Sequence, residues 1–221
     1  MGGAGVKRLL DGILEFHQKV RPHVRERFAQ LALGQSPDCL FVACSDSRVV
    51  PNLFASTDPG DLFVVRNVGN LVPRCGEHGV SSGDRSEAAA IEFAVLNLGV
   101  RDLIVCGHSE CGAMHALLAP EPPPGAVNLA AWLGAGRDSI TRLAAEPALG
   151  VHLATHNRLS QANVLQQLDH LRSYPVVAER VADGRLGLHG WYFDIAAAEV
   201  LAWRAEAGQF VPIAESLERS R

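Results

Sequence analysis

The sequence lacks a strong excess of charge, a long apolar run and the Gly-rich fingerprints of nucleotide-binding proteins. Its 221 residues hold 20 Lys and Arg against 24 Asp and Glu, a net charge of −4. No strongly basic surface is therefore available to neutralise phosphates, and we expect no nucleic-acid partner. No apolar run approaches the roughly 20 residues that span a bilayer, so we expect no membrane association. The absence of GxGxxG and P-loop motifs argues against dinucleotide enzymes, kinases and GTPases.

The N-terminus also lacks the features of an export signal. The first ten residues contain no apolar stretch followed by a small-residue cleavage site, so we expect a cytoplasmic location. An odd number of cysteines in a long chain does not resemble a disulfide scaffold. In a reducing compartment such cysteines are buried apolar residues, metal ligands or nucleophiles. The five cysteines are Cys39, Cys44, Cys75, Cys106 and Cys111.

The composition supports a sizeable core, because 48% of the residues are hydrophobic and only 20% are charged. Short apolar runs alternate with helical patterns, which predicts an α/β fold with a mainly parallel sheet flanked by helices. The predicted strands are residues 40–43, 62–65, 103–106 and 186–192. A further strand at 210–213 is expected at a sheet edge, since Pro212 cannot donate to a neighbouring strand. The predicted helices are residues 87–98, 111–118, 128–145 and 153–172.

We expect a single domain over residues 1–221, with N-terminal helices over 1–33 and an α/β core over 34–221 that carries the candidate site. Apolar side chains recur at steps of three or four through the first 33 residues, and Pro22 is expected to divide this stretch into two helices. The stripe fits a helical arm that covers a core, the commoner use of such a pattern, or one that binds a partner. The Pro-rich segment 120–125 is expected to be a loop within the domain.

Two segments of reactive residues directly follow predicted strands. One is residues 43–48, with the sequence ACSDSR, and the other is residues 107–112, GHSECG. Ligands bind beyond the carboxyl ends of the strands in open parallel sheets. Two thiolates and an imidazole, from Cys44, Cys111 and His108, form a ligand set that leaves a fourth zinc position open, as catalytic zinc requires. The alternative, two buried cysteines and a loop histidine, explains one motif but not the pairing of both after strands.

These motifs resemble those of the β-class carbonic anhydrases. The resemblance runs from about residue 35 to residue 194 in the family's order and spacing. It is carried by CSDSR at 44–48, FVVRNVGN at 63–70, IEFAVL at 91–96 and GHSECG at 107–112. The sequence GQSP at 34–37 is similar to the plant-like subgroup. The resemblance implies a zinc enzyme that interconverts carbon dioxide and bicarbonate, with one Zn²⁺ per chain, built as a dimer or tetramer.

The resemblance also implies roles for the residues around the metal. Cys44, His108 and Cys111 would hold Zn²⁺ with water in the fourth position, and zinc-bound hydroxide would attack carbon dioxide. Two thiolates offset the charge of the metal, so we expect a less acidic water than at a three-His site and faster hydration at alkaline pH. Asp46 and Arg48 are expected to form a bidentate pair that keeps Asp46 ionised and aimed at this water. A surface ion pair of little consequence is the alternative.

Some members of the family have a closed form, in which this Asp replaces the water on zinc. Members in which bicarbonate controls closure carry a Trp three residues before the first ligand and a Tyr near the last strand. Here Phe41 and Phe193 stand at those places, and Phe cannot donate a hydrogen bond. We therefore expect an open resting site, with Asp46 a ligand only in a closed form, and no bicarbonate inhibition of that kind.

The resemblance assigns substrate contacts to four further residues. Gln35 would donate a hydrogen bond to a substrate oxygen, and the backbone N–H of Gly112, early in a helix, would help to hold bicarbonate. Phe63 and Phe93 would form an apolar wall for carbon dioxide, reaching in from the partner subunit. Ordinary core packing is the alternative for both aromatic residues. The plant-like pattern has Tyr where Phe93 stands, so a hydroxyl is missing there.

Two other functions remain open for the same site. One is hydrolysis of a carbon dioxide analogue such as carbonyl sulfide or carbon disulfide, and the other is a non-catalytic zinc module. Cys39, Cys75 and Cys106 are expected to be structural, since two of them lie in or beside predicted strands. His115 falls near the same helix face as His108 and Cys111. A packed or solvated role is favoured for it over a proton relay.

Overall fold

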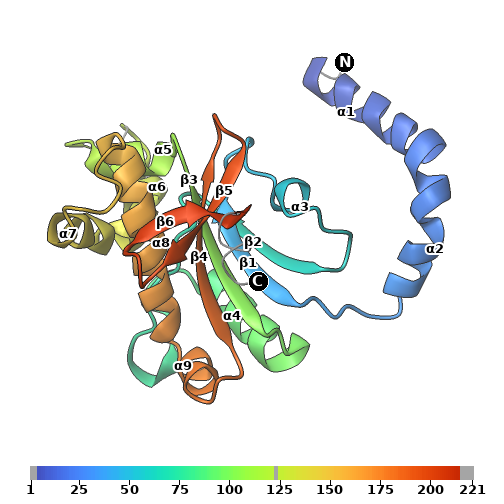
Figure 1. Ribbon diagram of the computed structural model, residues 1–221. Helices are drawn as coiled ribbons and strands as arrows, with labels where there is room; N and C mark the ends of the chain where they lie inside the picture. The colour runs from blue at the N-terminus through green and yellow to red at the C-terminus, as the bar shows by residue number, and fades with distance from the viewer. Residues whose placement is uncertain (1–3, 122–123, 215–221) are drawn as a thin grey trace. The chain divides into compact units, whose positions relative to one another are not determined.

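The computed structural model describes residues 4–121 and 124–214 (Figure 1). The chain forms two compact units, Met1–Ser36 and Pro37–Arg221. Residues 122–123, part of the predicted loop at 120–125, lie outside the described residues.

The first unit consists of consecutive helical segments. They are α1 (Ala4–Glu15), a π-helical turn η1 (Phe16–Val20) and α2 (Arg21–Leu31). Pro22 lies in the first turn of α2, where its missing N–H leaves no hydrogen bond unmade, and the irregular turn directly precedes it. None of the described residues of this unit is buried, and apolar side chains such as Leu9 and Ile13 are exposed. Whether these apolar side chains cover a core or bind a partner is not tested, so both uses stay predictions.

The second unit is built on a sheet with the strand order β2-β1-β3-β4-β5-β6. The first four strands in this order are parallel, and β5 and β6 are antiparallel additions at one edge. The prediction of a mainly parallel sheet is confirmed, and β6 lies at the edge as Pro212 required. The strand β5 was not predicted. The strands are β1 (Cys39–Cys44), β2 (Leu62–Asn67), β3 (Asp102–His108), β4 (Gly187–Asp194), β5 (Glu199–Arg204) and β6 (Gln209–Pro212).

Helices flank this sheet, and most of them match the predicted ranges. The helix predicted over 128–145 is divided into two by a short 3-10 turn. Gly136 lies in that turn, and a Cβ there would come 2.8 Å from Leu117 Cδ1, so any larger residue would force that side chain to move. The helices are α3 (Pro51–Phe54), η2 (Glu77–Gly79), α4 (Arg85–Glu92), η3 (Phe93–Leu98), α5 (Gly112–Leu118), α6 (Val127–Leu133), η4 (Gly134–Gly136), α7 (Asp138–Ala145), α8 (Thr155–Arg172) and α9 (Pro175–Ala182).

Side chains of the central strands alternate between the two faces of the sheet, and each face packs into its own hydrophobic core. Leu40 and Val42 point to one face and pack with residues of α4, α8 and α9. Cys39, Phe41 and Ala43 point to the other face, where the cluster includes Phe54 of α3. Helix α8, which contacts β3 and β4, lies alongside the sheet in Figure 1 and is buried along most of its length. The carboxyl ends of β1 and β3 are therefore held from one side by α8.

Gly107 of β3 marks the closest approach of the sheet to α8. A Cβ at this position would lie 2.7 Å from Val164 Cγ2 and 3.0 Å from Ser160 Oγ. We expect Gly107→Ala to lower the free energy of unfolding by about 1–3 kcal/mol, because overpacking forces neighbouring atoms to move. Gly134→Ala is the control, since nothing lies within 4 Å of its Cβ position. Thermal unfolding of both variants tests this, and equal melting temperatures would contradict the tight contact.

Candidate metal centre

The site lies between β1 and β3, where the order of strands in the sheet reverses. The chain passes from β1 to β2 on one side and later returns to β3 on the other, so β1 and β3 are neighbours, and ligands bind beyond the carboxyl ends of strands at such a position. Cys44 is the last residue of β1 and His108 is the last residue of β3. Cys111 directly precedes α5, with extended backbone geometry. Residues 64 positions apart are thus brought to one point by strand pairing.

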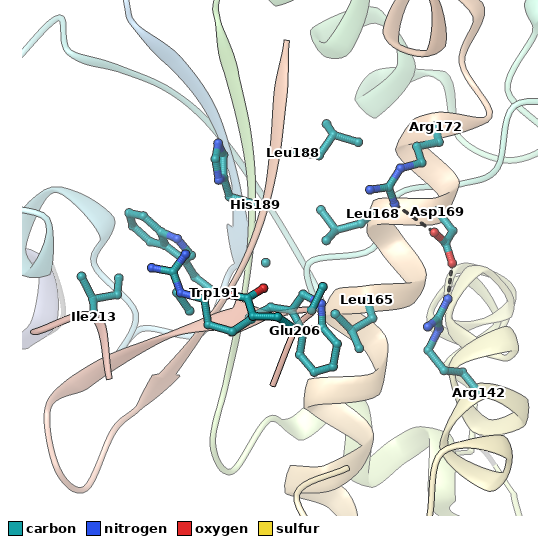
Figure 2. A pocket seen from close by; sticks show the side chains of 15 residues that line it. Arg142, Leu165, Leu168, Asp169, Arg172, Leu188, His189, Trp191, Glu206 and Ile213 are labelled. Carbon is teal, nitrogen blue, oxygen red and sulfur yellow. Dashed lines mark hydrogen bonds and ion pairs between the residues drawn. The ribbon is translucent and has the colours of Figure 1, made fainter. Parts of the chain in front are cut away.

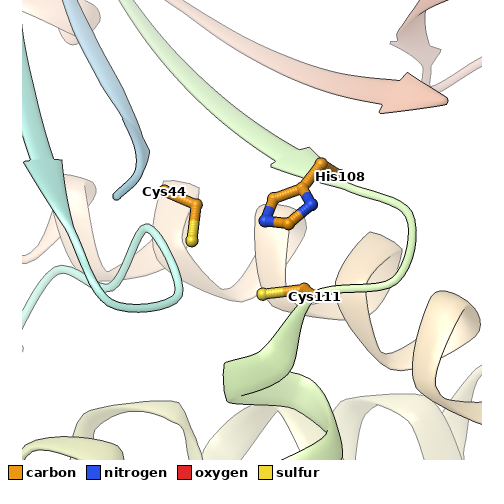
Figure 3. A group of neighbouring side chains, drawn as sticks. All are labelled: Cys44, His108 and Cys111. Atoms are coloured by element: carbon orange, nitrogen blue, oxygen red, sulfur yellow. The ribbon is translucent and has the colours of Figure 1, made fainter. Parts of the chain in front are cut away.

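Cys44, His108 and Cys111 converge there with their ligand atoms turned toward one another (Figure 3). The two sulfurs and a ring nitrogen of His108 all lie within 4.8 Å of one another, and all three residues are buried. Buried polar side chains are normally hydrogen-bonded, so a convergent unpaired set requires an explanation. The spacing of these atoms fits ligands around a single ion.

The tautomer of His108 fits a metal ligand. Its Nδ1 lies 2.8 Å from the carbonyl oxygen of Ser109, which can only accept, so Nδ1 carries the proton. The other nitrogen, Nε2, then bears a free lone pair, and it is buried with no hydrogen-bond partner. Ser160 fixes the backbone of His108 by accepting from its N–H at 3.2 Å and donating to its carbonyl at 2.9 Å. A metal ion would satisfy the orphaned nitrogen.

The surroundings of Cys44 favour a thiolate. The pKa of Cys44 is lowered, chiefly by the neighbouring Cys111 side chain and also by the backbone N–H of Gly69, which donates to the sulfur. The Gly69 nitrogen lies 3.4 Å from the Cys44 sulfur. The pKa of Cys111 is raised in turn by the neighbouring Cys44 thiolate and by burial. Two thiolates this close need a positive charge between them, which a divalent cation provides.

The remaining cysteines have no such surroundings. Burial raises the pKa of Cys39 to about 11, with Asp102 adding to the effect. Burial likewise raises the pKa of Cys75 and of Cys106. None of the five cysteines forms a disulfide, and these three are protonated, inert side chains at neutral pH.

Asp46 and Arg48 form a bidentate ion pair beside the centre. Arg48 Nε donates to Asp46 Oδ1 at 2.9 Å and Arg48 Nη2 donates to Asp46 Oδ2 at 2.7 Å. The same Nη2 also donates to the carbonyl oxygen of Glu110 at 3.0 Å, which ties the pair to the loop between His108 and Cys111. The Arg48 guanidinium holds the pKa of Asp46 well below its usual range. Asp46 is therefore a fixed, ionised acceptor.

Two residues of the edge strand β2, Arg66 and Asn67, hold the segment that follows β1. No role was predicted for either of them. Arg66 Nε donates to the Cys44 carbonyl at 3.0 Å, and its Nη2 donates to the Asp46 carbonyl at 2.8 Å. The carbonyl of Asn67 accepts from the N–H of Ser45 at 2.8 Å. Both residues belong to the FVVRNVGN motif, which was the only signal in the sequence that could have pointed to them.

The substrate residues suggested by the resemblance are not all near the centre. Gly112 is the first residue of α5, next to Cys111. The rings of Phe63 and Phe93 contact each other with centroids 5.8 Å apart. Phe63 pairs in register with Leu40, at the other end of β1 from Cys44, so the structure does not bring it to the centre of its own chain. Gln35 belongs to the first unit.

Phe41 and Phe193 take part in an aromatic cluster on the face of the sheet opposite α8. Phe41 contacts Trp191 with ring centroids 5.6 Å apart, and Phe193 stacks on Phe54 at 4.8 Å. Both phenylalanines are buried. The absence of bicarbonate control, which was expected from these two residues, remains a prediction.

A hollow of about 500 Å³ lies elsewhere, between α8 and strands β4 and β5 (Figure 2). Two acids, Asp169 and Glu206, line it, and Asp169 is paired with Arg172 at 3.0 Å and also with Arg142. No thiol lines it. No convergent set of ligand atoms from the described residues lies in this hollow.

Comparison with known proteins agrees with this geometry. A family model described as carbonic anhydrase matches residues 39–200. A carbonic anhydrase of Pseudomonas aeruginosa is 40% identical over 220 residues, covering 96% of this chain and 94% of that protein. Carbonic anhydrase 1 of Escherichia coli O157:H7 is 38% identical, covering 95% and 93%. The solved structure of the beta-carbonic anhydrase CcaA superposes with a TM-score of 0.85 at 37% identity, covering 95% of this chain and 92% of that one.

The fold and the cluster at the strand ends thus define an enzyme of the lyase class built on an α/β sheet. The chain belongs to the carbonic anhydrase family, in its β class, and its reaction is the reversible hydration of carbon dioxide. Among the described residues, no helix combines the length and the apolar character needed to cross a membrane.

Proposed function

We propose that Cys44, His108 and Cys111 bind one Zn²⁺ per chain and that carbon dioxide is hydrated beside it. The observation that carries this proposal is the buried, unpaired Nε2 of His108 facing two sulfurs. Two thiolates and one imidazole are a recognised zinc ligand set that keeps one position free. When bound there, the metal supplies Lewis acidity that makes hydroxide available near neutral pH.

The residues around the centre would then position the reactants. Asp46, held by two hydrogen bonds from Arg48, accepts a hydrogen bond from the attacking water and turns a lone pair of that water toward carbon dioxide. Because Arg48 keeps Asp46 engaged, Asp46 stays out of the coordination sphere in the resting enzyme. This arrangement supports an open site over the closed form and over a permanently closed zinc module.

We further propose that the substrate pocket is completed by a partner subunit. Phe63 and Phe93 form a contiguous apolar surface with Phe93 exposed, and this surface would wall the pocket of the partner. Gln35 would supply a hydrogen bond to a substrate oxygen. Gly112 would offer its N–H to bicarbonate. Two carbonic anhydrases of Sordaria macrospora, one of them 31% identical to this chain with a TM-score of 0.69, are described as tetrameric. Five free thiols are consistent with our proposal of a cytoplasmic enzyme.

Measuring zinc per chain together with the stopped-flow rate of carbon dioxide hydration tests the proposed function. We expect one zinc ion at this centre and a rate that rises from neutral to alkaline pH, because two thiolates offset the charge that acidifies water. Release of sulfide from carbonyl sulfide or carbon disulfide serves as the comparison reaction. Sulfide release faster than hydration would favour the analogue as substrate, and zinc without either activity would indicate a structural module.

The oligomeric state tests the shared pocket. We expect light scattering after size exclusion to give a dimer or a tetramer, since Phe63 and Phe93 reach a metal centre only across an interface. A full-length protein that is monomeric and fully active would contradict this arrangement of the pocket.

A further inference from the structure

A second group of ligand-type side chains lies on the exposed side of the metal centre. Glu110 belongs to the loop between His108 and Cys111, His115 lies in α5, and His156 lies in the first turn of α8. One ligand atom from each of Glu110, His115 and His156 lies within 4.8 Å of the other two. The sequence places Glu110 and His156 46 residues apart, so packing of α8 beside α5 brings them together.

The Nε2 atoms of His115 and His156 both face the carboxylate of Glu110. His156 Nε2 lies 3.0 Å from Glu110 Oε1, and His115 Nε2 lies 3.8 Å from Glu110 Oε2. The rings are stacked, with centroids 4.0 Å apart and planes inclined by 26°. Each imidazole therefore addresses a different oxygen of the same carboxylate.

Asn157 holds the carboxylate in this position. Its Oδ1 accepts from the Glu110 backbone N–H at 2.8 Å, and its Nδ2 donates to Glu110 Oε1 at 3.0 Å. Glu110 adopts a left-handed backbone conformation with φ 56°, which is uncommon outside glycine. A clamp of two hydrogen bonds on a strained residue keeps the carboxylate between the two histidines.

The three side chains form one donor set. His115 Nε2 and His156 Nε2 each face an oxygen of the Glu110 carboxylate, so a single cation held among these atoms would be bound by two imidazoles and one carboxylate. Two imidazoles and one carboxylate are a recognised set of protein ligands for Zn²⁺.

We propose that Glu110, His115 and His156 form a second Zn²⁺ site, distinct from the thiolate centre. The side chains of Glu110 and His115 are 54% and 53% exposed, so water can complete the coordination sphere and the ion can exchange with solvent. The Glu110 carbonyl accepts the hydrogen bond from Arg48, so one residue contacts both sites. This site is independent of the assignment of Cys44, His108 and Cys111.

The test is the number of zinc ions bound by the holoenzyme in excess Zn²⁺. We expect the wild-type protein to gain one ion beyond that of the thiolate centre, and His115→Ala and His156→Ala each to lose this gain. His152→Ala is the matched control, since His152 is exposed in the same part of the chain but outside the cluster. Its stoichiometry should equal that of the wild-type protein.

The melting temperature gives a second readout, because a ligand that binds only the folded protein stabilises it. Added Zn²⁺ is expected to raise it for the wild-type protein and His152→Ala, and not for the two cluster variants. The proposal is overturned if the wild-type holoenzyme gains no ion, or if both cluster variants still gain it. Loss of the first ion alone, as in a Cys44 variant, would leave this second gain intact.

Discussion

Cys44→Ala is expected to lose its zinc and to hydrate carbon dioxide about a thousandfold more slowly or worse. The change removes one of the three proposed ligands and leaves His108 and Cys111, which do not enclose an ion by themselves. Without the metal, no group at the site makes hydroxide available at neutral pH, and the reaction loses its principal source of acceleration. Zinc per chain and stopped-flow hydration, measured on the same preparation, check this prediction.

Cys106→Ala provides the matched control. Cys106 lies in β3, is fully buried and pairs in register with Ala43, the neighbour of Cys44, but its sulfur is not part of the cluster. Removing its sulfur leaves a cavity of similar kind, so any general loss of packing appears in both variants. We expect Cys106→Ala to keep zinc and activity. Undiminished zinc and hydration in Cys44→Ala would refute the ligand assignment.

The parts of the fold that could be predicted are those with strong local patterns. The strands β1 and β3 are buried on both faces, so they read as continuous apolar runs, and the polar residues that follow them stand out. A parallel sheet places such residues at one edge, which is why Cys44, His108 and Cys111 could be proposed together. Pro212 similarly marked β6 as an edge strand.

What the sequence did not indicate depends on tertiary packing. The strand β5 is half-buried, with no clear alternation of apolar and polar residues, and it is defined by pairing with β4 and β6. The pairing of Glu110 with His156 and Asn157 is equally non-local, since no pattern within α8 points to a loop 46 residues earlier. The 3-10 turn η4 likewise interrupts a helical pattern where Gly136 lies close to Leu117, a contact between segments that no local pattern shows.

Asp46→Asn is expected to keep its zinc and to lose turnover by about 10²- to 10⁴-fold, the range for a positioned acid–base group. The amide is isosteric, so the sulfurs and His108 keep their places. However, one carboxylate oxygen becomes an NH₂ group, which cannot accept from Arg48 or from water. Arg48 Nη2 would keep only its bond to the Glu110 carbonyl. Zinc content and kcat at saturating carbon dioxide measure the two effects separately.

Asp183→Asn is the control for this prediction. Asp183 forms an ion pair with Arg185, also two residues further along the chain, with Arg185 Nη2 2.6 Å from Asp183 Oδ2. It is exposed and lies outside the metal cluster, so its loss should change kcat by less than about twofold, since surface pairs contribute little. If both variants retain zinc and full turnover, the Asp46–Arg48 pair is an ordinary surface ion pair. If only Asp46→Asn loses turnover while its zinc stays bound, Asp46 acts on the reactants and not on the metal, because a ligand's loss would release the ion with the activity.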